Sequence, residues 1–152
     1  MKIEEIIKSN NVLDDAKKVI LNIMVTQSVV AEKFHELLKP YDLSSEQYNV
    51  LRILRGQKGN PSNLSMIQER MIAKNSNTTR LIDKLLSKKL VNREICPNNR
   101  RKIEVLITEN GLKILKELDP KVIEYEKFYA QNLTPEELLQ LNTLLEKYRN
   151  LK

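Results

Sequence analysis

Apolar residues recur with helical periodicity over most of the chain, and polar or helix-breaking residues divide them into segments. The first segment, 15–39, is followed by Pro40 and predicts one long helix. Ser44 and Gln47 then have the spacing of a capping box, in which the two side chains satisfy free N–H groups at a helix start. A second helix is therefore expected to begin after Ser44 and to end near Arg55.

Two shorter segments follow a loop rich in glycine, asparagine and proline. Asn63 is placed to cap a third helix of roughly ten residues, whose apolar positions are Leu64, Ile67, Met71 and Ile72. The polar residues 75–77 then interrupt the pattern and supply a cap for a fourth helix, 78–89. This helix is amphipathic, with a polar, basic face opposite Leu81, Ile82, Leu85 and Leu86.

The hydrophobic period changes from helical to strand-like after the fourth helix. Residues 91–95 and 103–107 alternate between apolar and polar side chains, as half-buried strands do. Pro97, Asn98 and Asn99 favour a turn between them. We therefore expect a β-hairpin that carries Arg100 and Arg101 at its tip.

The C-terminal third predicts two further helices. Thr108 is placed to cap a fifth helix, and Pro120 is expected to kink or restart it, because proline lacks the N–H that an uninterrupted helix uses. Thr134, Pro135 and Glu137 combine an N-cap, a first-turn proline and a capping-box glutamate, so a last helix is expected to begin there. The predicted fold class is mainly α with a small β-hairpin, an α+β arrangement.

Composition narrows the range of functions. A length of 152 residues suits a single domain, 1–152, and no segment has the apolar character of a secretory signal or a membrane span, so we expect a cytoplasmic protein with no membrane partner. His35 and Cys96 are the only histidine and cysteine, and the chain has no Gly-rich phosphate loop. We therefore expect no catalytic site, no metal site and no cofactor, and hence no enzyme.

Basic residues are concentrated in one part of the chain. The segment from Arg70 to Lys102 contains ten lysines and arginines but only two acidic residues, Asp83 and Glu94. Such clustering is typical of a surface that binds nucleic-acid phosphates, because phosphate neutralisation releases counterions. Basic stretches are also common as solvated faces, so charge alone does not decide between the two interpretations.

The order of the elements predicts a winged helix-turn-helix in residues 43–111. In this fold the second helix of the pair enters the major groove of DNA, and the hairpin forms a wing. The fourth helix is then the reader, since arginine and asparagine have side chains that bind base edges. The residues expected near bases are Asn75, Ser76, Asn77, Thr79 and Arg80, and those expected near phosphates are Lys84 and Lys88.

Three ordered segments resemble the MarR family of bacterial transcriptional regulators. Residues 43–51, LSSEQYNVL, are similar to the opening of that family's second helix. Residues 77–85, NTTRLIDKL, with 89–91, KLV, resemble its recognition helix and the exit into the wing. In the wing, five residues separate Arg101 from the pair Ile107 and Thr108, which resembles a signature of Asp, any residue, Arg, five residues, Leu-Thr.

This resemblance implies a homodimeric regulator of double-stranded DNA. The helical regions 1–39 and 112–152 would form the dimer, and repression on a pseudo-palindromic operator is implied by the family's tendency. The wing residues Asn99, Arg100 and Arg101 are implied as DNA contacts, with Arg101 in the minor groove and Arg100 on the backbone. Asn99 stands where the family has Asp, which removes a carboxylate that would orient an arginine.

Two questions stay open in the sequence. Many relatives bind small aromatic acids, so the resemblance implies a small aromatic or anionic effector, with Met24, His35 and Tyr48 as pocket candidates. Against this, such residues are more often ordinary helix-surface or core residues. The alternative function is a winged-helix protein-interaction module without specific DNA binding, which would need no positive charge on the reading face.

Overall fold

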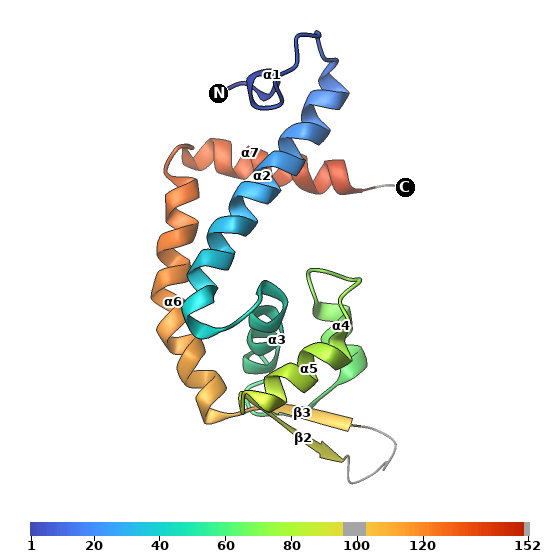
Figure 1. Ribbon diagram of the computed structural model, residues 1–152, viewed down its shortest axis with the longest axis vertical. Coiled ribbons are helices and arrows are strands. Elements are labelled where there is room, and N and C mark those ends of the chain that lie inside the picture. The colour runs from blue at the N-terminus through green and yellow to red at the C-terminus, as the bar shows by residue number, and fades with distance from the viewer. Residues whose placement is uncertain (96–102, 151–152) are drawn as a thin grey trace.

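A cluster of short helices and strands forms one end of the molecule, and two long helices extend from it (Figure 1). The computed structural model describes residues 1–95 and 103–150. Its helices are α1 (Ile3–Ile6), α2 (Asp15–Leu38), the 3-10 helix η1 (Lys39–Tyr41), α3 (Ser45–Arg55), α4 (Leu64–Arg70), α5 (Thr78–Ser87), α6 (Glu109–Ala130) and α7 (Pro135–Arg149). Its strands are β1 (Ser62–Asn63), β2 (Val91–Ile95) and β3 (Ile103–Ile107).

The three strands form an antiparallel sheet in the order β1-β3-β2. Val91 pairs with Ile107 and Ile95 pairs with Ile103, which confirms both predicted strands. The short strand β1 adds a third member that the sequence did not predict, with Ser62 opposite Val105. Residues 96–102, which connect β2 to β3, lie outside the described residues, so the expected hairpin tip is not placed.

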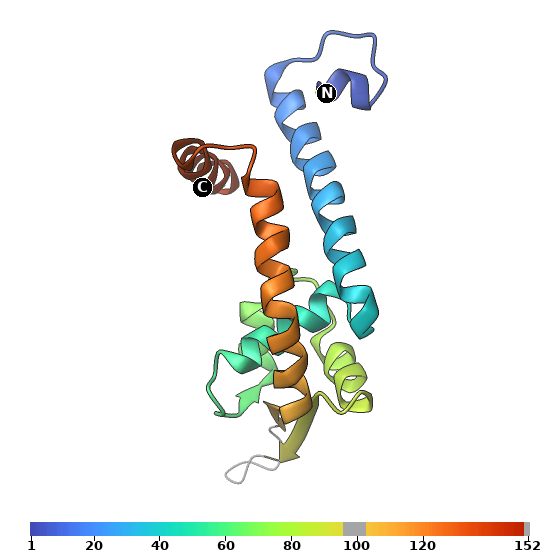
Figure 2. The same cartoon turned by 90° about the vertical axis from the view of Figure 1, so that its left-hand side faces the viewer.

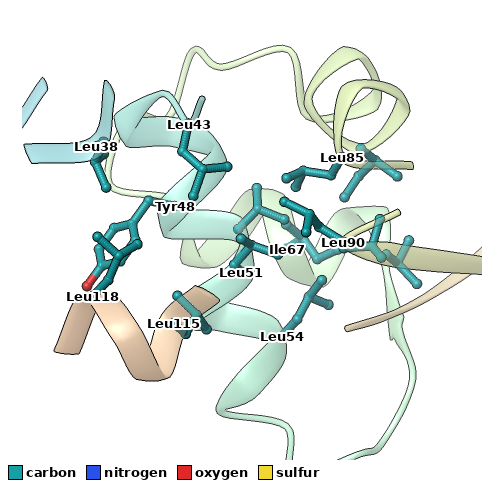
Figure 3. Close-up of a cluster of buried hydrophobic side chains, with 14 of the residues drawn as sticks. Leu38, Leu43, Tyr48, Leu51, Leu54, Ile67, Leu85, Leu90, Leu115 and Leu118 are labelled. Carbon is teal, nitrogen blue, oxygen red and sulfur yellow. The ribbon is translucent and has the colours of Figure 1, made fainter. Parts of the chain in front are cut away.

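The core lies where α3, α4, α5 and the sheet meet the first half of α6 (Figure 3). Leucines and isoleucines that point inward from each of these elements are fully buried, among them Leu51, Ile67, Leu85 and Leu115. We call α3 to β3, together with residues 109–119 of α6, the winged-helix unit. Burial of this apolar surface is the main force that holds the unit together.

Side-chain caps start the helices as the sequence predicts. The hydroxyl of Ser44 accepts a hydrogen bond from the N–H of Gln47, and the Gln47 amide oxygen accepts one from the N–H of Ser44. The side chains of Asn63 and Thr108 each accept one N–H at the start of α4 and α6, and Thr134 forms a capping box with Glu137 at the start of α7. These caps fix where each helix begins, because they satisfy N–H groups that have no partner within the helix.

Two helices end earlier than predicted. Helix α4 has 7 residues and ends at Arg70, because Met71 turns into an extended conformation that buries its side chain. Ile72, expected on the apolar face of that helix, is 83% exposed. Helix α5 ends at Ser87, two residues before Lys89, which adopts a left-handed conformation with φ of 59°.

Of the two expected effects of Pro120, the restart is wrong, because α6 continues from Glu109 to Ala130 with Pro120 inside it, and the kink stays a prediction. Proline removes only one intrahelical hydrogen bond, the one to the carbonyl four residues earlier. Leu118 and Val122, on either side of Pro120, are both buried in the core. Tertiary packing therefore carries the helix past a residue that would interrupt it in isolation.

Helices α2 and α6 run side by side away from the winged-helix unit (Figure 2). Two tyrosine hydroxyls of α6 donate to carbonyls of α2, from Tyr125 to Val30 at 3.0 Å and from Tyr129 to Val29 at 3.4 Å. Helix α7 crosses the middle of α2 in the view of Figure 1, and α1 packs at the far end of α2. We call α1, α2, residues 121–130 of α6 and α7 the helical arm.

Candidate nucleic-acid interface

Helices α4 and α5 form a helix-turn-helix whose turn is held by polar side chains. The side-chain oxygen of Asn49, on α3, accepts the N–H of Ile72 at 3.0 Å. Gln68, on α4, donates to the carbonyl of Lys74 and accepts the hydroxyl of Thr78. Because both ends of the turn are tied to neighbouring helices, the start of α5 has a defined position on the unit.

Helix α5 presents a polar face away from the core. Ile82 and Leu85 are buried against α3, whereas Thr79, Arg80 and Lys84 are exposed. The predicted base-facing residues gather before and within the first turn of the helix, with Ser76 half-buried and Asn75, Asn77, Thr79 and Arg80 exposed. An α-helix of this kind fits the major groove, which is about 12 Å wide in B-DNA.

Asn77 also has a structural role at the start of α5. Its side-chain oxygen Oδ1 accepts the backbone N–H of Arg80 at 3.0 Å, which makes Asn77 the N-cap. The oxygen therefore faces the first turn of the helix. The amide nitrogen Nδ2 and the second lone pair of Oδ1 are the groups that can bind an outside partner.

Arg93 on β2 is a basic residue beside α5 that the sequence analysis did not single out. Its guanidinium lies 3.3 Å from the carboxylate of Asp83, on the exposed face of α5. The pair joins the reader helix to the first strand of the wing. Arg93 belongs to the basic segment 70–102 and lies in a predicted strand next to the reader helix. These two features were the sequence signals that could have identified it as a site residue.

Lys88, expected near phosphates, has its ammonium group engaged within the protein. The Nζ atom lies 3.0 Å from the carboxylate of Asp42 and 3.3 Å from the side-chain oxygen of Gln47. It also donates to the backbone carbonyl of Asp42. These contacts fasten the end of α5 to the start of α3, so the phosphate contact of Lys88 stays a prediction with a competing local partner.

A hollow of about 480 Å³ lies between the end of α2, the start of α3 and the end of α5. His35 is exposed at this hollow, and the basic residues Lys39, Lys84 and Lys88 also line it. The other two effector candidates lie elsewhere. Met24 is 61% exposed farther along α2, and Tyr48 is 5% exposed within the core, where burial raises the pKa of its hydroxyl.

A second and larger cavity, of about 1000 Å³, is a groove between α2 and α7. Apolar side chains line most of it, including Ile23, Leu141, Leu144 and Tyr148. None of the three effector candidates lines this groove. It lies in the helical arm, between helices that cross in Figure 1 and stand apart in Figure 2.

The remaining expectations concern the DNA contacts of the wing, the lack of a membrane span and the lack of a metal site. The wing residues Asn99, Arg100 and Arg101 belong to the connection 96–102, which lies outside the described residues, and their DNA contacts stay predictions. Within residues 1–95 and 103–150, no helix has the length and apolar character to cross a membrane. The same residues contain no group of three or more histidine, cysteine or acidic side chains arranged to hold a metal ion.

Comparisons with known proteins agree on one family. The family model described as "MarR family" matches residues 43–103. The HTH-type transcriptional repressor IacR of Pseudomonas putida is 30% identical over 115 residues, which cover 76% of this chain and 68% of that protein. An uncharacterized HTH-type transcriptional regulator of Bacillus subtilis, YfiV, is 36% identical over 96 residues, covering 63% of this chain and 59% of that protein.

Solved structures show the same fold. A MarR-like transcription regulator from Bacillus cereus has a TM-score of 0.79 and 25% identity, covering 89% of this chain and 96% of that one. A MarR transcription factor from Planctomyces limnophilus has a TM-score of 0.69 and 32% identity, covering 90% and 98%. These likenesses confirm the predicted winged helix-turn-helix and a regulatory rather than enzymatic role. The chain belongs to the MarR family of helix-turn-helix transcriptional regulators.

Proposed function

We propose that this protein is a homodimeric repressor that binds a pseudo-palindromic operator in double-stranded DNA. The observation that carries the proposal is the exposed polar start of α5, held on a helix-turn-helix whose apolar side chains Ile67, Ile82 and Leu85 are buried. Two such reader helices in a two-fold dimer match half-sites about one helical turn, ~34 Å, apart. A repressing role is supported by the similarity to IacR, which is a repressor.

The proposed contacts divide between bases and phosphates. Asn75, Ser76, Asn77, Thr79 and Arg80 lie where base edges would face the first turn of α5. Lys84 and Arg93 flank that turn with basic groups, and Arg100 and Arg101 of the wing, beside Asn99, extend the proposed surface. The positive charge of this surface favours DNA over the alternative of a protein-interaction module, because a protein partner needs no such charge.

The proposed dimer uses the helical arm. Apolar side chains stay exposed on every helix of the arm, among them Ile23, Ile123, Phe128 and Leu144. Contiguous exposed apolar surface of this kind marks an interaction site. A second copy would cover these residues and would place two α5 helices on one face of the assembly.

A small aromatic or anionic effector is proposed for the hollow that contains His35. Two structures of similar fold support this idea: BpsR of Bordetella bronchiseptica, whose DNA binding is regulated by 6-hydroxynicotinic acid, and the organohalide-sensing RdhR-CbdbA1625 bound to 2,4-dichlorophenol. Lys39 and Lys84 line the hollow together with His35 and supply positive charge for an acid. A ligand there would contact α5 directly and so affect the position of the reader helix.

The test is selection of genomic DNA fragments by the purified protein, followed by salt titration on the enriched sequence. We expect a two-fold-symmetric motif and an affinity that falls steeply with ionic strength. Arg80→Ala should weaken binding by roughly 5- to 100-fold at one base position, whereas its thermal unfolding and its oligomeric state should stay those of the wild-type chain. Absence of binding over the whole salt range would overturn the proposal.

A further inference from the structure

Helix α6 is shared between the two regions of the molecule. Its first half packs into the winged-helix unit through Leu115 and Leu118, which are fully buried. Its second half belongs to the arm, where Tyr125 and Tyr129 bond to the carbonyls of α2. Helix α6 is thus one continuous helix that joins the winged-helix unit to the arm, and its curvature sets the orientation of the arm relative to the unit.

Pro120 lies at the boundary between these halves. It has no N–H, so the carbonyl of Lys116 lacks its usual intrahelical partner and the helix is weakened at this point. A helix with such a weak point bends more easily unless neighbouring contacts hold both sides. The structure shows two contacts of that kind, one on each side of the proline.

The first contact is an ion pair between Arg55, at the end of α3, and Asp119. Both guanidinium nitrogens donate, from NH1 to Oδ2 at 2.8 Å and from NH2 to Oδ1 at 3.0 Å. This two-pronged geometry fixes direction as well as distance, which a single hydrogen bond does not. The residues are 64 positions apart in the chain, so the pair joins separate elements.

The second contact places Lys121 over the ring of Tyr41 in η1, with Nζ 5.1 Å from the ring centre. This distance is within the range of a cation–π interaction. The Tyr41 hydroxyl also raises the pKa of Lys121, which keeps the ammonium charged. The residues on both sides of Pro120 are therefore attached to other elements. Asp119 is attached to α3, and Lys121 is attached to η1.

We propose that Arg55 and Asp119 are positioning residues that fix the direction in which α6 leaves the winged-helix unit, and thereby the angle of the arm and the half-site spacing that the dimer accepts. The proposal rests on the proposed function, since spacing has meaning only for two linked readers. Neither residue lies on the reading face of α5. Their effect is expected on the selection among spacings and not on the recognition of a single half-site.

The first experiment compares DNA duplexes that differ only in spacing. The selected operator competes with versions that have one base pair added or removed at its centre. We expect Asp119→Asn and Arg55→Met each to lower the preference for the native spacing at least five-fold, with little change in affinity for an isolated half-site. The double variant should lose no more than either single variant, because the two residues act as one pair.

The matched control is Glu36→Gln, the same change from acid to amide. Glu36 pairs with Lys33 at 2.8 Å within α2, so the loss of that pair does not change how α6 leaves the winged-helix unit. This control should keep the wild-type preference. If the wild-type chain selects one spacing and the Asp119 and Arg55 variants select it equally well, the positioning role is wrong although the proposed function stands. If the wild-type chain binds no duplex, both are wrong.

A second measurement needs no DNA and shows whether the variants are folded. Spin labels at Ser65→Cys on α4 and Glu124→Cys on α6, in a Cys96→Ser background, report the orientation of the unit and the arm. Labelled chains are diluted with unlabelled ones so that only distances within one chain are seen. We expect one narrow distance for the unmodified pair and a distribution about twice as wide for Asp119→Asn. An equally narrow distribution in a folded variant would overturn the inference.

Discussion

The winged-helix unit and the helical arm are both built from amphipathic helices, yet they bury their apolar faces to very different extents. In the unit, Leu51, Ile67, Leu85 and Leu115 are inaccessible to solvent. In the arm, no residue of α7 is buried, although the structure describes all of that helix, and in α2 only Leu38 is buried. The unit thus completes its core within one chain, whereas the arm has apolar surface for a partner.

The largest expected difference concerns leucine side chains in the two regions. Leu115→Ala removes a fully buried side chain and should lower the free energy of unfolding by about 2–5 kcal/mol at any protein concentration. Leu144 is 54% exposed in the single chain, so Leu144→Ala should act only through the dimer. Thermal unfolding at several concentrations distinguishes them. A concentration-independent loss of that size for Leu144→Ala would contradict the comparison.

A second prediction concerns the tight contact between α6 and the sheet. A Cβ atom at Gly111 would lie 2.5 Å from the carbonyl oxygen of Leu90 and 2.7 Å from Ile107, so Gly111→Ala must displace backbone. We expect a loss of about 1–3 kcal/mol, measured by urea unfolding. Gly56→Ala is the control, because its nearest neighbour would be at 3.3 Å. Equal effects at the two sites would show that α6 tolerates movement here.

Helix caps allow the same chemistry to be tested in each region. Ser44→Ala removes the cap of α3 and should cost about 1 kcal/mol of global stability. Thr134→Ala removes the equivalent cap of α7, which has no buried residue in the single chain. Its effect should therefore appear as faster hydrogen exchange in α7 without a change in the unit. Faster exchange throughout the chain would show that the two regions unfold together.

The smallest expected effect is a gain in stability. Lys89 has a φ of 59°, a conformation that is strained for residues with a Cβ and favourable for glycine. Lys89→Gly should raise the free energy of unfolding by up to about 1 kcal/mol. The Lys89 carbonyl accepts the Thr108 hydroxyl at 2.9 Å, and this bond can remain. A loss of stability, measured by thermal unfolding of the unit, would show that the lysine side chain has a role there.

Local sequence signals predicted the elements that local forces determine. The strands 91–95 and 103–107 and the caps at Ser44, Thr108 and Thr134 agree with the structure because alternation and capping act over a few residues. The continuous α6 did not follow from such signals, since contacts with distant elements hold the helix at Pro120. The early end of α4 likewise depends on Asn49, which is distant in sequence and accepts the N–H of Ile72.

The candidate site shows the same division. The polar start of α5 was predictable, because its amphipathic pattern and N-cap are contained in one short segment. The engagement of Lys88 by Asp42 was not, since the two residues are 46 positions apart. The same holds for His35, which reaches the hollow beside Lys84 only through the packing of α2 against α3 and α5. Met24 and Tyr48, grouped with His35 from the sequence, are separated by the fold.

The cap at the start of α5 limits how much information Asn77 can take from DNA. An asparagine that reads adenine with both its oxygen and its nitrogen identifies one base of the four. Here one of the two lone pairs of the oxygen accepts the N–H of Arg80, and this cap fixes the direction in which the other lone pair and the amide nitrogen face. In the major groove, adenine, guanine and thymine all offer an acceptor, whereas cytosine offers a donor. Where that direction lets only the nitrogen reach a base, the base must offer an acceptor, so the operator position opposite Asn77 should tolerate adenine, guanine and thymine.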